Sequence, residues 1–267
     1  MQNNNQLFTG QWAIILGGSS GFGLATAQKL ALHGMNIAVL YRETAAAERS
    51  LKEQLAQFAR TNNVTIEPYN INALDGNART TFIQQFSQNK KNTVKLLLHS
   101  IARGNLKPLS PTENNNETLS VADIQLTTYA MATSLLDWTR ELLNVDAFDS
   151  DARIIGLTSE GAHKYWEGYA AVSVAKASLE SLVTYMAVEL AKYGLKTNLI
   201  QAGITATPSL KRIPGSEKLL EVTAERNPLG RMTEPKDVAN VIYLLCTPEA
   251  AWINGTVIHV DGGEHCR

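Results

Sequence analysis

The sequence predicts an α/β fold in which a doubly wound parallel sheet of about seven strands carries helices on both faces. Short apolar runs alternate along the chain with longer stretches whose apolar residues recur at helical spacing. Uninterrupted apolar runs are typical of parallel strands, because such strands are buried on both faces. A glycine-rich stretch directly follows the first apolar run, where a strand would turn tightly into a helix.

The first half of the chain contains four expected strands and three expected helices. The first run, Trp-Ala-Ile-Ile-Leu, precedes the glycines and a helix with apolar residues at positions 24, 27, 30 and 31. The next helix is highly charged and follows a second apolar run. The expected strands are 12–16, 36–40, 64–69 and 94–99, and the expected helices are 24–32, 45–60 and 78–88.

The second half continues the alternation with three further strands and three helices. A polar, turn-rich stretch at 112–120 ends in Ser120, which is a suitable cap for a long helix that has Asp123 in its first turn. The apolar runs and helical patterns then follow one another to the end of the chain. The expected helices are 121–143, 168–192 and 237–246, and the expected strands are 152–158, 195–200 and 256–260.

Length and composition indicate a single domain, residues 1–267. The chain has 267 residues, 44% of them apolar, and its 24 Lys+Arg against 25 Asp+Glu leave a formal charge of −1. This balance provides no general attraction to nucleic acid or anionic lipid. We find no apolar run of membrane-spanning length and no signal-peptide pattern, and the two cysteines suit a reducing compartment, so we expect a cytoplasmic protein.

Two segments fall outside the regular alternation. Residues 1–9 are expected to form a flexible tail. Residues 203–229 follow the sixth strand and contain three prolines and a short amphipathic piece at 217–224. Ligands bind beyond the carboxyl ends of the strands in such folds, so we interpret 203–229 as a substrate-binding lid. An ordinary surface loop is the alternative.

The glycine loop after the first strand predicts a dinucleotide site. Its glycines would allow a tight turn, a close approach of backbone to phosphate, and close packing of helix on strand. The helix N-terminus would add free N–H groups and a positive dipole end, and two serines would add hydroxyl donors. These features make the fold Rossmann-like, and the residues expected at the cofactor are Gly17, Ser19, Ser20, Gly21, Phe22 and Gly23.

The end of the second strand favours NADPH over NADH. An acidic residue there would accept a hydrogen bond from a ribose 2′-hydroxyl and repel a 2′-phosphate. The strand instead ends in Tyr41 and Arg42, and a guanidinium can bind a phosphate with paired N–H donors. In the alternative, Arg42 is a surface residue paired with Glu43. Asn70 and Ile71, after the third strand, are expected beside the adenine.

The segment from Tyr169 to Lys176 is the most informative for chemistry. On a helix, a spacing of seven residues places both side chains on one face, about two turns apart. A tyrosine near a lysine and a cofactor makes a proton donor or an oxyanion stabiliser. The alternative is a packed amphipathic helix with an exposed lysine. Tyr165 lies four residues before Tyr169 and is a second candidate for the same role.

These motifs resemble the short-chain dehydrogenase/reductase family over nearly the full chain. The matching parts are the glycine loop, the Tyr/Lys helix and the tail at 255–263. Most members carry a tyrosine four residues before the lysine, whereas Val172 occupies that position here. The spacing of seven is similar to the divergent branch of enoyl-acyl-carrier-protein reductases. The stretches 99–102 and 175–180 also resemble that branch, and 164–169 and 227–232 are most similar to its NADPH-preferring type III enzymes.

The resemblance implies roles for individual residues. Tyr169 would stabilise or protonate an enolate, and Lys176 would hold the nicotinamide ribose. Ser159 occupies the slot of the catalytic serine in ordinary relatives; it is either a donor to the substrate or a strand-end hydroxyl that satisfies its own loop. Further cofactor contacts are implied after the fourth and sixth strands, at Ser100, Ile101, Ala102, Gly203, Ile204, Thr205 and Thr207.

The resulting hypothesis is an NADPH-dependent enoyl-acyl-carrier-protein reductase of fatty-acid or related acyl-chain synthesis. The alternatives are another short-chain reductase acting on a free ketone or enone, and a non-catalytic NADPH sensor. Family habit implies a homotetramer, and no metal, nucleic acid or membrane partner is expected. An acidic acyl carrier protein would require a local basic rim, for which the candidates are Arg103, Lys107, Lys211 and Arg212.

Overall fold

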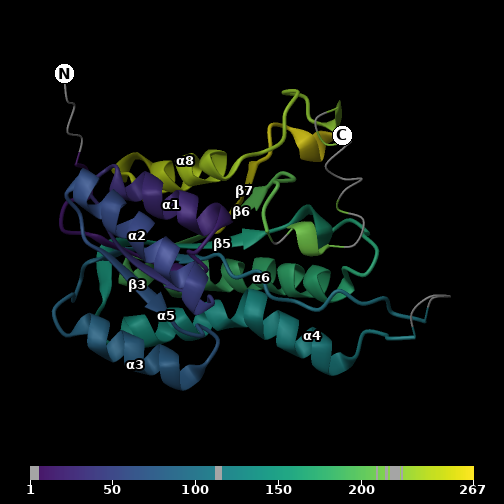
Figure 1. The fold of residues 1–267 in the computed structure, drawn as a ribbon, viewed down its shortest axis with the longest axis horizontal. Helices are drawn as coiled ribbons and strands as arrows, with labels where there is room; N and C mark the ends of the chain where they lie inside the picture. Colours follow the sequence, from purple (N-terminus) through teal and green to yellow (C-terminus); the bar gives the residue numbers. More distant parts are fainter. Residues whose placement is uncertain (1–5, 112–115, 209, 214–215, 217–222, 224) are drawn as a thin grey trace.

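The computed structural model describes residues 6–111, 116–208, 210–213, 216, 223 and 225–267. Its seven strands form one parallel sheet in the order β3-β2-β1-β4-β5-β6-β7, which confirms the predicted fold class (Figure 1). The strands are β1 (Trp12–Leu16), β2 (Asn36–Tyr41), β3 (Ile66–Asn70), β4 (Val94–His99), β5 (Phe148–Thr158), β6 (Lys196–Ala202) and β7 (Val257–Val260).

Helices cover both faces of the sheet, as Figure 1 shows. Successive side chains of a strand point to opposite faces. In β1, Ile15 therefore packs with the helices α1 (Gly21–Ala31), α2 (Ala45–Asn62) and α8 (Pro235–Cys246). Ile14 packs with α3 (Gly76–Ser87), α5 (Ser134–Asn144) and α6 (Ala170–Glu189) on the other face. This two-sided burial is the physical reason that the strands read as continuous apolar runs.

Side-chain caps set where several helices begin. The Thr44 hydroxyl accepts from the Ala47 N–H (3.4 Å), and the Asp75 carboxylate accepts from the Ala78 N–H (2.8 Å). Asp75 therefore starts α3 two residues before the expected position 78. Pro235 stands in the first turn of α8, where its missing N–H costs no helical hydrogen bond.

The long helix expected at 121–143 is interrupted by a π-helical turn. It consists of α4 (Val121–Thr128), the π-helical segment Tyr129–Thr133 and α5. The predicted cap is present: Ser120 accepts from the Asp123 N–H (3.1 Å), while the Asp123 carboxylate accepts from the Ser120 N–H (3.0 Å). The insertion is invisible to a periodicity argument, because apolar residues occur on both sides of it.

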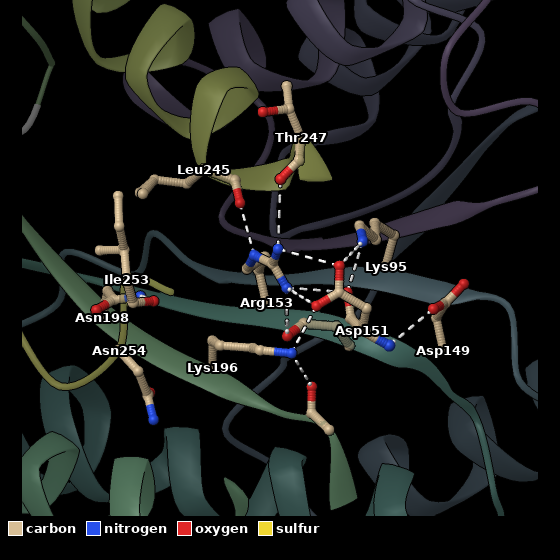
Figure 2. A network of polar contacts seen from close by, with 12 residues as sticks. Lys95, Asp149, Asp151, Arg153, Lys196, Asn198, Leu245, Thr247, Ile253 and Asn254 are labelled. Atoms are coloured by element: carbon tan, nitrogen blue, oxygen red, sulfur yellow. Dashed lines mark hydrogen bonds and ion pairs between the residues drawn. The ribbon is translucent and has the colours of Figure 1, made fainter. Parts of the chain in front are cut away.

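Strand β5 begins four residues before the expected position 152, within a polar run that the apolar pattern excluded. Its early part carries Asp151, whose carboxylate binds Arg153 (2.7 Å), Lys196 (2.6 Å) and Lys95 (2.8 Å). Figure 2 shows these side chains converging between neighbouring strands, with the buried Arg153 guanidinium also donating to the carbonyl of Leu245 (2.6 Å). Although burial opposes ionisation of Asp151, the three cations hold its pKa well below the ordinary range.

The expectation for the N-terminal tail is revised, whereas most of the expected lid helix is not described by the structure. The flexible tail predicted for 1–9 is wrong for residues 6–9, because Phe8 is 2% exposed and its N–H donates to the His33 carbonyl (3.1 Å). Its ring lies edge-on to Tyr243 of α8 (centroids 5.9 Å apart). The amphipathic piece expected at 217–224 lies, except for Thr223, outside the described residues.

Helix α6 is, within the described part of the chain, long and apolar enough by composition to cross a membrane. Leu179, Val183 and Met186 of this helix pack into the core beneath the sheet. The same helix carries the buried Lys176, which is one of the predicted site residues.

Candidate active site

The predicted site residues gather at the carboxyl ends of the central strands. The glycine loop follows β1, Ser100 follows β4, Ser159 follows β5 and Gly203 follows β6. In a parallel sheet these ends share one edge, which is where such folds bind ligands.

The glycine loop fits a pyrophosphate. Gly17 has a φ of +85°, and a Cβ there would collide with the Ser100 carbonyl. A Cβ on Gly23 would collide with the Gly17 carbonyl, so helix α1 can start this close to β1 only without one. Ser20 precedes α1 without capping it through its side chain, which leaves the first-turn amides available to an anion.

The segment after β6, residues 203–207, is expected at the nicotinamide and approaches this loop. A Cβ built on Gly21 would meet the Thr207 methyl at 3.4 Å, so Thr207 is a direct neighbour of the loop. The Thr205 hydroxyl donates to the Gly203 carbonyl (2.9 Å), and both threonines are buried. The structure therefore brings together the predicted cofactor residues that follow β1, β4 and β6.

The segment after β2 is held against the end of β3. The Ile71 N–H donates to the Tyr41 carbonyl (2.9 Å), and the Asn70 side chain bonds both backbone groups of Glu43 (3.0 Å each). Arg42 is exposed and makes no ion pair with Glu43 or any other described residue. The alternative of an Arg42–Glu43 pair is therefore not observed, and the guanidinium is available to a ligand.

Tyr41 differs from its neighbours because its side chain belongs to the core. It is 3% exposed, packs with Leu51 and Leu55 of α2, and its hydroxyl has no hydrogen-bond partner among the described atoms. Burial, with the charge of Glu48, raises the pKa of this phenol. A contact from Tyr41 to a cofactor would thus come from its backbone.

Tyr169 and Ser159 meet at the mouth of the site. Their hydroxyl oxygens are 3.4 Å apart, and the Ser159 oxygen also accepts from the Gly161 N–H (3.2 Å). The ring of Tyr169 lies so close to Gly161 that a Cβ there would be 2.5 Å from it. Burial raises the pKa of Tyr169, although the bond with Ser159 opposes this, so the phenol is protonated at neutral pH. Ser159 thus satisfies its own loop, which was one of the two roles expected for it, and its role as a donor to the substrate stays a prediction.

Tyr165 does not share that surface. It is 89% exposed and lies in the turn before α6, which begins only at Ala170. Gly168, with a φ of +70°, breaks the chain between the two tyrosines, so the helical spacing between them does not apply. The structure therefore brings Tyr169 to Ser159 and leaves Tyr165 in solvent.

Lys176 is buried rather than exposed. Its ammonium donates to the Leu157 carbonyl (2.7 Å), and burial lowers its pKa to about 8 against the opposing charge of Glu180. The Glu180 carboxylate accepts from the Thr158 hydroxyl (2.6 Å) and bonds His163 (2.7 Å). Lys176 thus remains mostly protonated at neutral pH, with its ammonium held near the carboxyl end of β5.

If Lys176 holds the nicotinamide ribose, as the resemblance implies, affinity for a nicotinamide dinucleotide should fall by about tenfold between about pH 7 and about pH 10, because deprotonation would remove a charged hydrogen bond. The lowered pKa of about 8 places the transition in this range. Titration calorimetry across pH measures the effect. Lys176→Met should bind more weakly and without this transition; an unchanged transition in the variant would contradict the assignment.

His99, at the end of β4, is a structural residue. It is 1% exposed and its Nε2 lies 2.8 Å from the Ser134 hydroxyl of α5. Burial, together with the charge of Lys176, lowers the pKa of His99 to about 3, so the ring is neutral in the folded protein.

This predicts an acid sensitivity. The pKa of His99 in the folded protein lies below its ordinary value of 6.5. Above about pH 6.5 His99 therefore causes no loss of stability, and below it the free energy of unfolding falls, because the unfolded chain takes up a proton that the folded protein does not. Two pH units below this value the loss is about 2 to 3 kcal/mol. Urea unfolding of the wild type and His99→Asn over this range measures it. The wild type should lose that much more than the variant, and parallel curves would refute the prediction.

Sequence reasoning missed the side chains that support the segment after β6, which contains Ile204. Glu264, 2% exposed, accepts from the Ile204 N–H (3.2 Å), and burial raises the pKa of its carboxyl. Arg226, at the base of the expected lid, reaches Glu264 (3.8 Å) and Glu160 (2.5 Å). These contacts join residues 38 to 66 positions apart in the chain, and no local pattern signals them.

The parallel sheet, the glycine loop and the Tyr169–Lys176 helix together define a nicotinamide-dinucleotide-dependent oxidoreductase of the short-chain dehydrogenase/reductase class. The chain belongs within it to the enoyl-(acyl carrier protein) reductase family, whose family model matches residues 17–265. It is 32% identical over 185 residues to an enoyl-[acyl-carrier-protein] reductase [NADH] of Aquifex aeolicus, covering 68% of this chain and 66% of that protein.

A second relative in sequence and one solved structure are also similar to this chain. A 3-oxoacyl-[acyl-carrier-protein] reductase of Synechocystis is 30% identical over 259 residues, covering 96% of this chain and 97% of that protein. The crystal structure of the Aquifex aeolicus enoyl reductase superimposes with a TM-score of 0.81 at 26% identity, covering 98% of each chain. The fold and the family are thus shown, and the two relatives differ in the bond that their names say they reduce.

Proposed function

We propose that this chain is an enoyl-thioester reductase that uses NADPH to reduce the carbon–carbon double bond of an acyl chain carried by acyl carrier protein. The observation that supports this proposal is the position of Tyr169. It is the half-buried tyrosine paired with Ser159, and it stands seven residues before Lys176 instead of four. Val172 fills the four-residue position and is 4% exposed, packed with Met131 and Ala175.

The altered spacing suits the longer reaction geometry. Seven residues of helix correspond to a rise of about 10 Å, against about 6 Å for four. In ketone reduction, the carbon that receives hydride also carries the oxygen that is protonated. In enoyl thioester reduction, hydride adds to the β-carbon while negative charge develops on the thioester oxygen, farther along the substrate. A donor displaced from the lysine toward that oxygen can stabilise the charge.

The chain's own residues have distinct tasks in this reaction. The bound cofactor supplies the hydride. Lys176 would bind the nicotinamide ribose hydroxyls from its anchored position on the Leu157 carbonyl. Tyr169 would donate its hydroxyl proton toward the thioester oxygen and so stabilise the enolate, while Ser159 keeps a hydrogen bond to the phenolic oxygen.

The proposed preference for NADPH rests on Arg42. Its exposed, unpaired guanidinium follows β2, where the family's dinucleotide fold presents the adenosine ribose. The Aquifex aeolicus relative is named for NADH. The choice between the two cofactors is therefore a direct test of this residue.

Reduction of a 3-oxoacyl thioester is the second candidate. The relative named for that reaction matches 96% of this chain, a longer span than the match to the enoyl reductase sequence. Against it stands Val172, an apolar side chain at the position where a ketone-reducing relative carries its tyrosine. A sensor that binds NADPH without turnover is a third reading.

NADPH oxidation with crotonyl, 3-oxoacyl and free-ketone substrates separates these functions. We expect kcat/KM for the enoyl thioester to exceed that for the 3-oxoacyl thioester by at least about 100-fold, the range of a correctly placed acid–base group. A reversed preference would replace the proposal with 3-oxoacyl reduction. Tight NADPH binding without turnover of any substrate would identify a sensor.

We further propose that the enzyme is a homotetramer that meets its carrier protein through basic side chains at the site's mouth. The exposed apolar residues Tyr185 and Val188 on α6 support contact between copies along that helix. Arg103 and Lys211 are exposed, whereas Lys107 already pairs with Asp123 (3.5 Å). Arg103, Lys211 and Arg212, which is also exposed, are therefore the stronger candidates for the acidic carrier.

A further inference from the structure

A cysteine and a histidine in the turn after β7 lie in series with an aspartate that precedes this turn. Residues Glu264–Cys266 form a short 3-10 turn directly after two glycines with positive φ, Gly262 (+63°) and Gly263 (+85°). The turn folds back over the end of β7. Figure 1 shows the C-terminus at the edge of the molecule to which the strands point.

The three side chains have the geometry of an activated nucleophile. The Cys266 sulfur lies 3.4 Å from Nε2 of His265, and Nδ1 of His265 lies 2.6 Å from the Asp261 carboxylate. A histidine held by a carboxylate and facing a thiol can act as a general base toward it. Cys266 is exposed, so a reagent can reach the sulfur.

Asp261 determines which nitrogen of His265 faces the thiol. It is 5% exposed, and its carboxylate accepts from the N–H groups of Gly263 (3.0 Å) and His265 (2.9 Å). Burial alone would favour the protonated acid, but these hydrogen bonds hold the pKa of Asp261 below its ordinary value. An ionised Asp261 accepts only, so Nδ1 carries the hydrogen and the lone pair of Nε2 faces Cys266.

A cavity lies beside the imidazole, and Cys266 itself stands outside its lining, next to His265. This cavity of about 530 Å³ is lined by His259, Asp261, Gly263 and His265, with Arg231 also on its wall. The rings of His259 and His265 stack with centroids 3.9 Å apart, which fixes the plane of the base. The volume lies in the range of small-molecule sites.

The other cysteine provides a contrast within the same chain. Cys246 is buried in α8, and burial raises the pKa of its thiol to about 12. Without access or a base, Cys246 is an inert core residue in the folded protein. Any selective thiol chemistry of the native protein therefore falls on Cys266.

We propose that Cys266 is a modification site that exchanges with low-molecular-weight disulfides, with His265 as its base and Asp261 as the residue that orients the base. The Cys266 thiol gives its proton to His265 Nε2 as its sulfur attacks one sulfur of the disulfide. The new S–S bond forms as the old one breaks, and the departing thiolate takes the proton from His265. One disulfide is exchanged for another, and excess dithiol reverses the step.

The modified residue would lie two positions from Glu264, which holds the Ile204 N–H of the segment after β6. The Arg226 guanidinium also contacts the Glu264 carbonyl and the Arg267 carbonyl (3.5 Å each). The site is therefore built into the same turn that supports the base of the expected lid.

The test is the rate of disulfide exchange with Ellman's reagent and with oxidised glutathione at pH 7. We expect native protein to react at one thiol about tenfold faster than a peptide of residues 262–267, because a free thiol is only a few per cent ionised there. Mass spectrometry should place the adduct on Cys266, and the second thiol should react only after denaturation. Cys266→Ser should remove the fast phase, whereas Cys246→Ser should keep it.

His265→Gln and Asp261→Asn separate activation from mere exposure. Both should slow the reaction to the rate of the peptide, with melting temperature and NADPH binding measured alongside to verify folding. A native rate equal to that of the peptide, a His265→Gln rate equal to wild type, or an adduct on Cys246 would each overturn the proposal.

Discussion

Tyr169→Phe is expected to lower kcat for an enoyl thioester by at least about 100-fold while leaving NADPH affinity within about twofold. The substitution removes only the hydroxyl that pairs with Ser159 at 3.4 Å. The ring would still pack against Gly161 and the apolar cluster around Met131, so the fold should persist. Stopped-flow turnover and fluorescence titration of NADPH measure the two quantities.

Tyr165→Phe is the matched control, since it makes the same chemical change four residues earlier on an 89% exposed side chain. It should keep kcat near the wild-type value. Equal losses in the two variants, or retained activity in Tyr169→Phe, would remove Tyr169 from its proposed role. Retained activity in Tyr169→Phe would also make Ser159 the better candidate for the donor to the substrate.

Arg42→Ala is expected to weaken NADPH binding by about 10- to 100-fold and to leave NADH binding unchanged. Hydrogen bonds between charged groups contribute about 1.5 to 3 kcal/mol, and only NADPH carries the 2′-phosphate that a guanidinium would bind. Arg42 is exposed, so its removal should not affect folding. Equilibrium titration with each nucleotide gives the ratio.

Glu43→Gln is the control for Arg42→Ala, because it removes the neighbouring negative charge and keeps the guanidinium. Glu43 is fixed through its backbone by Asn70, and its side chain makes no ion pair with Arg42 in the described structure. Its replacement should change the NADPH-to-NADH preference much less than Arg42→Ala. Equal weakening of both nucleotides in Arg42→Ala would contradict the assignment of NADPH.

The fold could be predicted from sequence because its core follows local rules. Strands such as Trp12–Leu16 are buried on both faces and therefore continuously apolar, and Ser120 caps its helix as its residue type suggests. The polar start of β5 was missed because Asp151 is stabilised by Arg153 and Lys196, one of them on another strand. Phe8 was missed for the same reason, since its partner Tyr243 is distant in sequence.

In the site, too, features set by neighbouring residues could be predicted, and features set by contacts between distant segments could not. The glycine loop could be predicted because its turn and its helix N-terminus are properties of neighbouring residues. The choice between Tyr165 and Tyr169 could not, because it depends on a break at Gly168 that moves the helix start to Ala170. The support from Glu264 and Arg226 also depends on chain segments that meet only in the folded protein.

The most direct measurement follows the hydride itself. NADPH that carries deuterium at its transferable position is incubated with an enoyl thioester, and the product is analysed by mass spectrometry and NMR. The proposed function predicts a saturated acyl thioester with one deuterium on its β-carbon. Recovery of unreduced enoyl thioester, together with deuterium on the hydroxyl-bearing carbon of the product from a 3-oxoacyl thioester, would contradict it.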